Sequence, residues 1–294
     1  MLSLVRRLFE MIRFSHTLFA MPFALLSAAL AWRDEPFRWL DLLGILLCLI
    51  FARSAAMAFN RVVDRDIDAL NLRTAKRHIP AGSLSVRAVV AFTLFCSASF
   101  VASTALFLLR EPPNPWPIYL AGPVLVFICA YSLTKRFTAL AHFWLGASLM
   151  IAPLAAWIAV RGMVDLETSL VIGGAVLFWV SGFDILYACQ DAEFDKKAKL
   201  ASVPAKIGIP ASLKVAFGCH VVMLALLLLL AFVNSHLGAI YLIGLGAIAM
   251  LLAYEHWLVR PDDLTRVNQA FFQVNGIISV GLLLLVLVQL AVNG

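Results

Sequence analysis

Long apolar stretches follow one another through almost the whole 294-residue sequence. An α-helix needs about 18–20 consecutive apolar residues to cross the hydrocarbon core of a bilayer. Nine stretches meet this length, near residues 15–32, 40–60, 87–109, 117–134, 139–160, 168–188, 212–233, 237–256 and 270–291. The sequence therefore predicts an all-α polytopic membrane protein with nine transmembrane helices.

The composition excludes an ordinary soluble domain. Hydrophobic residues make up 63% of the chain and charged residues 14%, whereas soluble domains are about 45–50% apolar and about 25% charged. The connections between the spans are short, so we expect a single domain over residues 1–294. The five cysteines are scattered through apolar runs without CxxC spacing, which indicates buried structural residues and no disulfide framework or thiolate metal site.

The N-terminal segment resembles a signal peptide, because Arg6 and Arg7 precede an apolar stretch. That stretch is long enough to span, however, and eight more follow, so a retained first helix is the better interpretation. Arg13 and His16 lie at its entry. Residues 2–12 have the pattern of a short amphipathic helix at the membrane interface.

The distribution of Lys and Arg predicts the orientation. Segments on the N-terminal side of the membrane carry most of the 23 basic residues, and those on the other side carry only Arg33, Arg38, Arg110 and Arg161. Because inward-facing loops are rich in Lys and Arg, we expect a cytoplasmic N-terminus and location in the cell's inner membrane. The net charge of +6 is then mostly a topology signal and gives little reason to expect a nucleic-acid partner.

The stretch AFNRVVDRDID places a carboxylate cluster at the end of the second span. Asn60, Asp64 and Asp68 stand four residues apart, which places them within an arc of about 80° on a helix. Asp66 points to the opposite side, beside Arg65, and is interpreted as a solvated or ion-paired residue. Amide and carboxylate oxygens at this spacing suit Mg²⁺ and do not suit zinc.

The stretch FDILYACQDAEFD supplies a second cluster. Asp184, Asp191 and Asp195 fall within an arc of about 40° if the helix continues, with Tyr187 close to that face and Glu193 pointing away. Asp184 lies within an apolar span, where an ionised group costs at least ~2.5–3.5 kcal/mol.

Ordinary solvated helix ends would explain either cluster taken alone. Two clusters on the same predicted side of the membrane, each followed by a basic loop, favour a common metal site. Facing carboxylate clusters hold divalent cations that bridge a phosphate. The basic residues of these loops suit a diphosphate; they are Arg73, Lys76, Arg77, Lys196, Lys197, Lys199 and Lys206. For each lysine taken individually, the preference for basic inner loops is the better explanation.

Arg53 is an ionised residue within the second predicted span, seven positions before Asn60 and on the same helical face. A charge inside a membrane span indicates a functional site. A structural ion pair with Asp184 is equally consistent with the sequence.

These motifs resemble those of the UbiA superfamily of intramembrane aromatic prenyltransferases. The resemblance rests on NRVVDRDID, RTAKRHIPAG and DAEFD, and on the shorter stretches RFSHTLFAMPFA, YSLTKRFTALAHFWLG and ASVPAKIG. It extends over nearly the whole chain. It implies nine helices around a central cavity, with cytoplasmic loops that cap the active site.

The resemblance also implies a chemistry. Mg²⁺ would bind the diphosphate of a polyprenyl donor through the metal ligands Asn60, Asp64, Asp68, Asp191 and Asp195. Departure of diphosphate would leave an allylic carbocation, which an electron-rich aromatic ring attacks to form a carbon–carbon bond. Charge neutralisation is the implied role of Arg73, Lys76, Arg77 and Lys196, and substrate binding that of Arg136, Arg53 and Asp184. Tyr187 would contact the diphosphate or the cation. A role of Tyr187 in helix packing is the alternative.

The acceptor is expected to be a hydroxylated aromatic acid of the 4-hydroxybenzoate type in ubiquinone biosynthesis. Many family members have Arg-Pro where this chain has Arg77-His78. Some relatives of the matching subgroup serve menaquinone synthesis, so a dihydroxynaphthoate is the alternative acceptor. Haem and chlorophyllide are more distant alternatives. The rival from another class is a secondary transporter, whose acids would lie near the bilayer midplane. Here they gather at one membrane face, which favours the enzyme.

Overall fold

The computed structural model describes residues 2–12 and 19–293. These residues form helices with short 3-10 and π turns, and no β-strand occurs among them. The α-helices are α1 (Leu2–Met11), α2 (Met21–Ala31), α3 (Trp39–Val63), α4 (Arg65–Leu70), α5 (Val86–Thr104), α6 (Trp116–Thr134), α7 (Ala141–Arg161), α8 (Glu167–Ala188), α9 (Ala192–Lys197), α10 (Val203–Ile207), α11 (Ile209–Val233), α12 (Ala239–Leu258), α13 (Val267–Gln269) and α14 (Asn275–Asn293).

Eight helical segments in the described part of the chain are long and apolar enough to cross a membrane. They correspond to the predicted spans from 40–60 onward, and most of their ends differ from the prediction by three residues or fewer. The first predicted span, 15–32, is described only from residue 19, where α2 is apolar but short. Arg13 and His16 lie outside the described residues. The all-α membrane fold is confirmed, and the helix count of nine is approximate.

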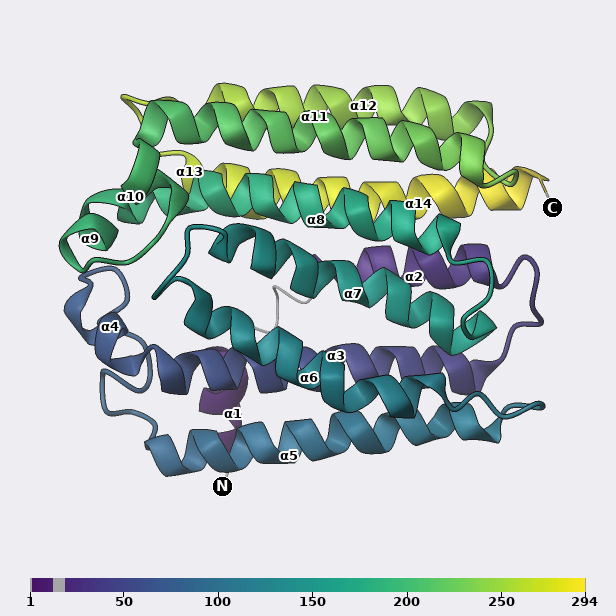
Figure 1. Cartoon of the computed structure of the whole chain (residues 1–294), viewed down its shortest axis with the longest axis horizontal. Coiled ribbons are helices and arrows are strands. Elements are labelled where there is room, and N and C mark those ends of the chain that lie inside the picture. The colour runs from purple at the N-terminus through teal and green to yellow at the C-terminus, as the bar shows by residue number, and fades with distance from the viewer. Residues whose placement is uncertain (1, 13–18, 294) are drawn as a thin grey trace. The chain divides into compact units, whose positions relative to one another are not determined.

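The chain divides into two compact units. Unit 1 comprises Met1–Thr17 and Arg38–Leu133, and unit 2 comprises Leu18–Phe37 and Thr134–Gly294. In unit 1, α3 packs along α5 (Figure 1). In unit 2, α8 packs against both α7 and α11, while α14 packs against α2 and α12. One domain over residues 1–294 stays a prediction.

Helix α8 forms the core of unit 2. Its buried side chains lie on every side of the helix, from Ile172 through Trp179 to Leu186. Gly146 of α7 permits a close approach, because a Cβ at this position would stand only 2.6 Å from Ser181 Oγ and would also meet the Leu177 carbonyl oxygen. The contact of α7 with α8 therefore depends on a residue without a side chain.

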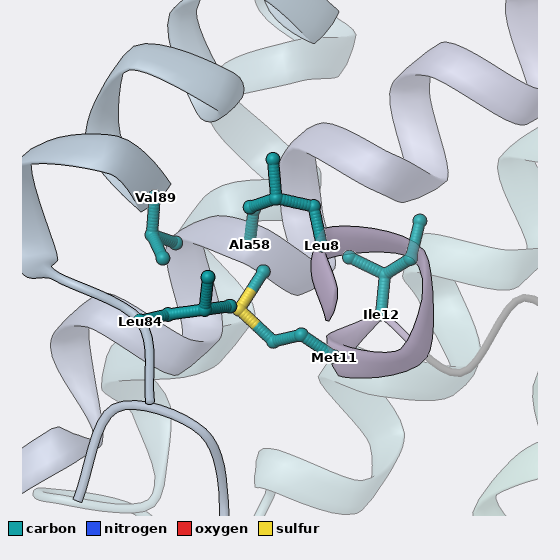
Figure 2. Close-up of a cluster of buried hydrophobic side chains, with 6 residues drawn as sticks. All are labelled: Leu8, Met11, Ile12, Ala58, Leu84 and Val89. Atoms are coloured by element: carbon teal, nitrogen blue, oxygen red, sulfur yellow. The ribbon is translucent and has the colours of Figure 1, made fainter. Parts of the chain in front are cut away.

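Helix α1 is amphipathic and packs within unit 1. Figure 2 shows Leu8, Met11 and Ile12 gathered against three residues of α3, α5 and the segment before α5; these are Ala58, Leu84 and Val89. The guanidinium of Arg7 donates to the Ser83 carbonyl at 3.2 Å. The predicted N-terminal helix is present and packs against α3, α5 and the end of the loop between them, and its position at the membrane interface stays a prediction.

Weakening this packing should expose the loop to protease. Met11 is 2% exposed and Phe9, on the same helix, is 47% exposed. We expect Met11→Ser to increase the rate of tryptic cleavage after Arg73, Lys76 or Arg77 several-fold, because a polar side chain at a buried position favours local opening. Phe9→Ser is the matched control and should cleave at the wild-type rate. Equal cleavage of the two variants would show that α1 does not restrain the loop.

Candidate active site

The first carboxylate cluster lies where α3 ends. Helix α3 stops at Val63 and α4 begins at Arg65, but the four-residue hydrogen bonding continues across the junction. The Asp64 N–H donates to the Asn60 carbonyl at 2.9 Å, and the Asp68 N–H donates to the Asp64 carbonyl at 2.7 Å. All three side chains of the motif are therefore held at helical spacing, and all three residues are buried.

Asp66 occupies the opposite side, as the helical period predicts. Its side chain is 83% exposed, and its carboxylate lies 3.4 Å from Arg65 Nε. Asn60, Asp64 and Asp68 are thus buried. Asp66, which lies two residues from both Asp64 and Asp68, is exposed.

Polar contacts tie the buried donors together. The Asn60 amide donates to Asp64 Oδ2 at 2.9 Å. Arg77 Nη1 donates to both oxygens of Asp68, at 2.6 and 2.7 Å. Arg77, predicted to bind the donor diphosphate, therefore neutralises a predicted metal ligand in this structure. Thr74 Oγ1 donates to the Asp68 carbonyl at 3.0 Å and fixes the start of the basic loop.

The ion pair between Arg77 and Asp68 is partly buried, with side-chain exposures of 26% and 5%. Arg77→Ala leaves the carboxylate without this cation, which should lower the free energy of unfolding by about 1–2 kcal/mol, less than for a fully buried pair. The double variant Arg77→Ala/Asp68→Asn should recover most of the loss, measured as Tm in detergent. A double variant as unstable as Arg77→Ala would contradict this interpretation.

The other basic residues of this loop face solvent. Arg73 and Lys76 are exposed, and the Arg73 N–H donates to Asn71 Oδ1 at 2.9 Å. His78 Nε2 lies 3.9 Å from Glu10 Oε2 of α1. The pKa of Glu10 is lowered, mainly by its hydrogen bond with Arg6. His78 thus lies beside the N-terminal helix.

In unit 2, Asp184 is paired with a residue that the sequence did not single out. His142 Nδ1 lies 2.7 Å from Asp184 Oδ2, and the Val203 N–H donates to His142 Nε2 at 3.3 Å. Since a backbone N–H only donates, Nε2 is the acceptor and Nδ1 carries the proton that is donated to Asp184. His142 therefore joins α7, α8 and the start of α10.

Asp191 and Asp195 lie beyond a break in the helix. A 3-10 turn over Cys189–Asp191 separates α8 from α9, so the common arc of the three acids, which depended on a continuous helix, does not apply. Asp195 nevertheless shares a side-chain hydrogen bond with Ser202 and interacts with Asp191, Lys135 and His142. His142 thus contacts Asp184 directly and interacts electrostatically with Asp195.

The loops around the second cluster are linked by the backbone, because the Ala201 N–H donates to the Lys135 carbonyl at 2.7 Å. Arg136 and Lys196 are exposed, and so is Glu193, in agreement with its predicted outward direction. Tyr187 packs against the ring of Phe271 at a centroid distance of 4.4 Å, and its contact with diphosphate or cation stays a hypothesis.

Arg53 is partly buried in α3 and interacts electrostatically with Tyr131 of α6, in the same unit. Its predicted partner Asp184 belongs to unit 2, where His142 pairs with it. The pair of Arg53 with Asp184 stays a hypothesis.

The donor sets suit a hard divalent cation. Among the described residues, no group of three or more His, Cys, Asp and Glu side chains is gathered closely enough to hold a metal ion. Each unit nevertheless contains carboxylates four residues apart in sequence, and the buried Asn60–Asp64 pair offers the oxygen ligands that Mg²⁺ prefers. The residues present therefore fit Mg²⁺.

Comparison with known proteins places the chain among membrane prenyltransferases. The profile described as the UbiA prenyltransferase family matches residues 20–277. The chain is 32% identical to the 4-hydroxybenzoate octaprenyltransferase of Nitrosospira multiformis, over 80% of this chain and 79% of that protein.

Solved structures agree with this fold. A UbiA homolog from Aeropyrum pernix K1, in its apo form, has a TM-score of 0.79 and 27% identity, with coverage of 95% of this chain and 98% of that one. A UbiA homolog from Archaeoglobus fulgidus bound to DMAPP and Mg²⁺ has a TM-score of 0.73 over 97% of this chain and 99% of that chain; its identity of 20% supports the fold alone.

Proposed function

Because the chain belongs to the UbiA prenyltransferase family, and is thus a multi-pass membrane enzyme, we propose that it transfers a polyprenyl group from polyprenyl diphosphate to the ring of a 4-hydroxybenzoate-type acid. The observation that carries the proposal is the buried Asn60, Asp64 and Asp68 set at the end of a membrane helix. The name of the relative from Nitrosospira multiformis supports the acceptor, and the ligands named for the Archaeoglobus fulgidus homolog support a prenyl diphosphate with Mg²⁺.

The two carboxylate motifs would hold the metal. Asn60, Asp64 and Asp68 would contribute from one motif, and Asp191 and Asp195 from the other. Bound Mg²⁺ would act as a Lewis acid on the diphosphate leaving group. The exposed cations near these motifs would bind the diphosphate oxygens; they are Arg73, Lys76, Arg136 and Lys196.

The residues around the motifs would direct the rest of the reaction. When the allylic C–O bond breaks, its electron pair leaves with diphosphate, and basic side chains neutralise the charge that develops. The aromatic ring donates a π pair to the cation, and the ring proton is then lost. No enzyme nucleophile is needed, so exclusion of water by apolar side chains becomes the main requirement.

We also propose the orientation and compartment given by the basic residues. The N-terminus and both motif loops would face the cytoplasm, in a cell membrane that is the inner one where two are present. Lys and Arg residues near the ends of spans determine such topology. A cysteine-free variant with single cysteines at Lys76 or Arg161, labelled from either side of sealed vesicles, would test it.

The proposed reaction can be tested with purified protein, Mg²⁺ and prenyl diphosphates of several lengths. We expect transfer to 4-hydroxybenzoate, and loss of the product when EDTA removes the metal. A dihydroxynaphthoate assayed in parallel tests the menaquinone alternative: product with this acceptor only would reassign the acceptor while keeping the reaction class. Absence of product with every donor and acceptor would exclude the proposed reaction.

A further inference from the structure

A buried carboxyl group that the proposed reaction does not use lies in unit 2. Glu255 is fully buried, although it lies within α12, one of the helices apolar enough to cross a membrane. Ionisable residues inside spans are costly, and they mark functional sites. The Asn275 amide donates to Glu255 Oε1 at 2.7 Å, so the carboxyl group is held by a specific polar partner.

Asn275 connects three parts of unit 2. Besides Glu255 of α12, it accepts a hydrogen bond from the indole N–H of Trp179 in α8 at 2.6 Å. Its amide also donates to the Ala270 carbonyl at 3.2 Å. Asn275 and Trp179 are as completely buried as Glu255. In a buried network of this kind, loss of one member leaves the others unsatisfied.

Ala270 is the first residue of a π turn, Ala270–Val274, which carries Phe271 and Phe272. Single π turns inside helices occur frequently at functional sites. Consecutive residues of a regular α-helix point about 100° apart, yet both rings contact Tyr187, at centroid distances of 4.4 and 6.4 Å. Two adjacent phenylalanines of the π turn thus contact one tyrosine.

The ring cluster leads along α8 toward the second carboxylate motif. Trp179, Phe183 and Tyr187 stand four residues apart along α8, and Asp191 follows four positions later at the end of the 3-10 turn. Rings of Trp179 and Phe183 lie 4.9 Å apart, and rings of Phe183 and Phe271 lie 5.1 Å apart. Trp179 is fully buried, whereas Tyr187 and both phenylalanines of the π turn are partly exposed. The more exposed end of the cluster on α8 is therefore Tyr187, the ring nearest to Asp191 in sequence.

We propose that Glu255 and Asn275 are positioning residues that hold the π turn, so that Phe271, Phe272 and Tyr187 present a fixed aromatic surface to the allylic cation. The inference rests on the proposed function. Aromatic faces attract cations, and a fixed surface also keeps water away. Two fates compete for the cation: attack by the acceptor ring, which forms the C–C bond and releases the ring proton, and attack by water, which gives the prenyl alcohol and a proton.

The experiment measures how prenyl diphosphate divides between prenylated acceptor and prenyl alcohol, with purified protein and Mg²⁺. This ratio does not depend on the amount of active enzyme, so a purely structural role would leave it unchanged. We expect Glu255→Leu and Asn275→Leu each to raise the alcohol-to-product ratio about threefold or more. Glu255→Gln keeps an oxygen acceptor for Asn275 and should restore the wild-type ratio.

Tyr241→Phe is the matched control, because it removes a buried hydrogen bond of α12, from Tyr241 to the Leu227 carbonyl at 2.8 Å, far along the helix from Glu255. Its ratio should equal that of the wild type.

Unchanged ratios in both leucine variants, with a wild type that transfers the prenyl group, would overturn the inference and leave the proposed function intact. Should those variants not fold, Phe271→Leu decides: an unchanged ratio overturns the inference, and a raised ratio supports it. A wild type without transfer would instead refute the proposed function.

Discussion

Replacing Asp64 by asparagine is expected to lower kcat about 100-fold or more, because a tenfold change corresponds to ~1.4 kcal/mol and a metal Lewis acid supplies several kcal/mol. Asparagine retains an acceptor for the Asn60 amide, whose bond to Asp64 is 2.9 Å long, but it lacks the negative charge. The protein should therefore stay folded while losing metal-dependent turnover. Prenyl transfer at saturating donor, with Tm in detergent, measures both properties.

Asp66→Asn is the matched control for this prediction. It removes the same charge two residues away, from a side chain that is 83% exposed, and should keep kcat close to the wild-type value. The corresponding comparison in the second motif is Asp191→Ala, with a large loss, against Glu193→Ala, with little. Near-normal turnover by Asp64→Asn or Asp191→Ala would remove that residue from the proposed metal site.

Gly146→Ala should destabilise the protein by about 1–3 kcal/mol, the usual cost of overpacking a tight contact. Its Cβ would stand 2.6 Å from Ser181 Oγ and would also meet the Leu177 carbonyl, so α7 and α8 must separate. His142 lies one helical turn from Gly146 on α7, and its 2.7 Å contact with Asp184 should lengthen as they do. We therefore expect a lower Tm together with a lower rate of prenyl transfer.

Gly218→Ala provides the control for Gly146→Ala. Gly218 belongs to α11 in the same unit, and a Cβ there would meet nothing within 4 Å. Alanine favours the helix relative to glycine, so Tm and activity should not fall. Equal Tm values for the two variants would show that α7 and α8 adjust to an added methyl group without cost.

The membrane helices could be predicted from sequence because length and hydropathy determine them locally. The helical period likewise placed Asp66 on the exposed side, away from Asp64 and Asp68. Each of these predictions depends on residues close together in the chain.

Contacts between distant residues could not be predicted in this way. His142 stands 42 positions from Asp184, and Asn275 stands 96 positions from Trp179; hydropathy does not show which helices face each other. A signal was present for Glu255, a charged residue in an apolar run, and such residues indicate function by default. The break at Asp191 and the π turn have no comparable signal, because both depend on tertiary packing.

Helix α1 packs against residues that lie some fifty or more positions later in the chain. The buried side of α1 is completed by Ala58, Leu84 and Val89, which emerge only after two further apolar segments have been synthesised. Until then Leu8 and Met11 have no protein surface to cover them, and an amphipathic segment in this state binds at a membrane surface. Burial of the apolar side of α1 thus requires α3, the start of α5 and the end of the basic loop between them to be in place.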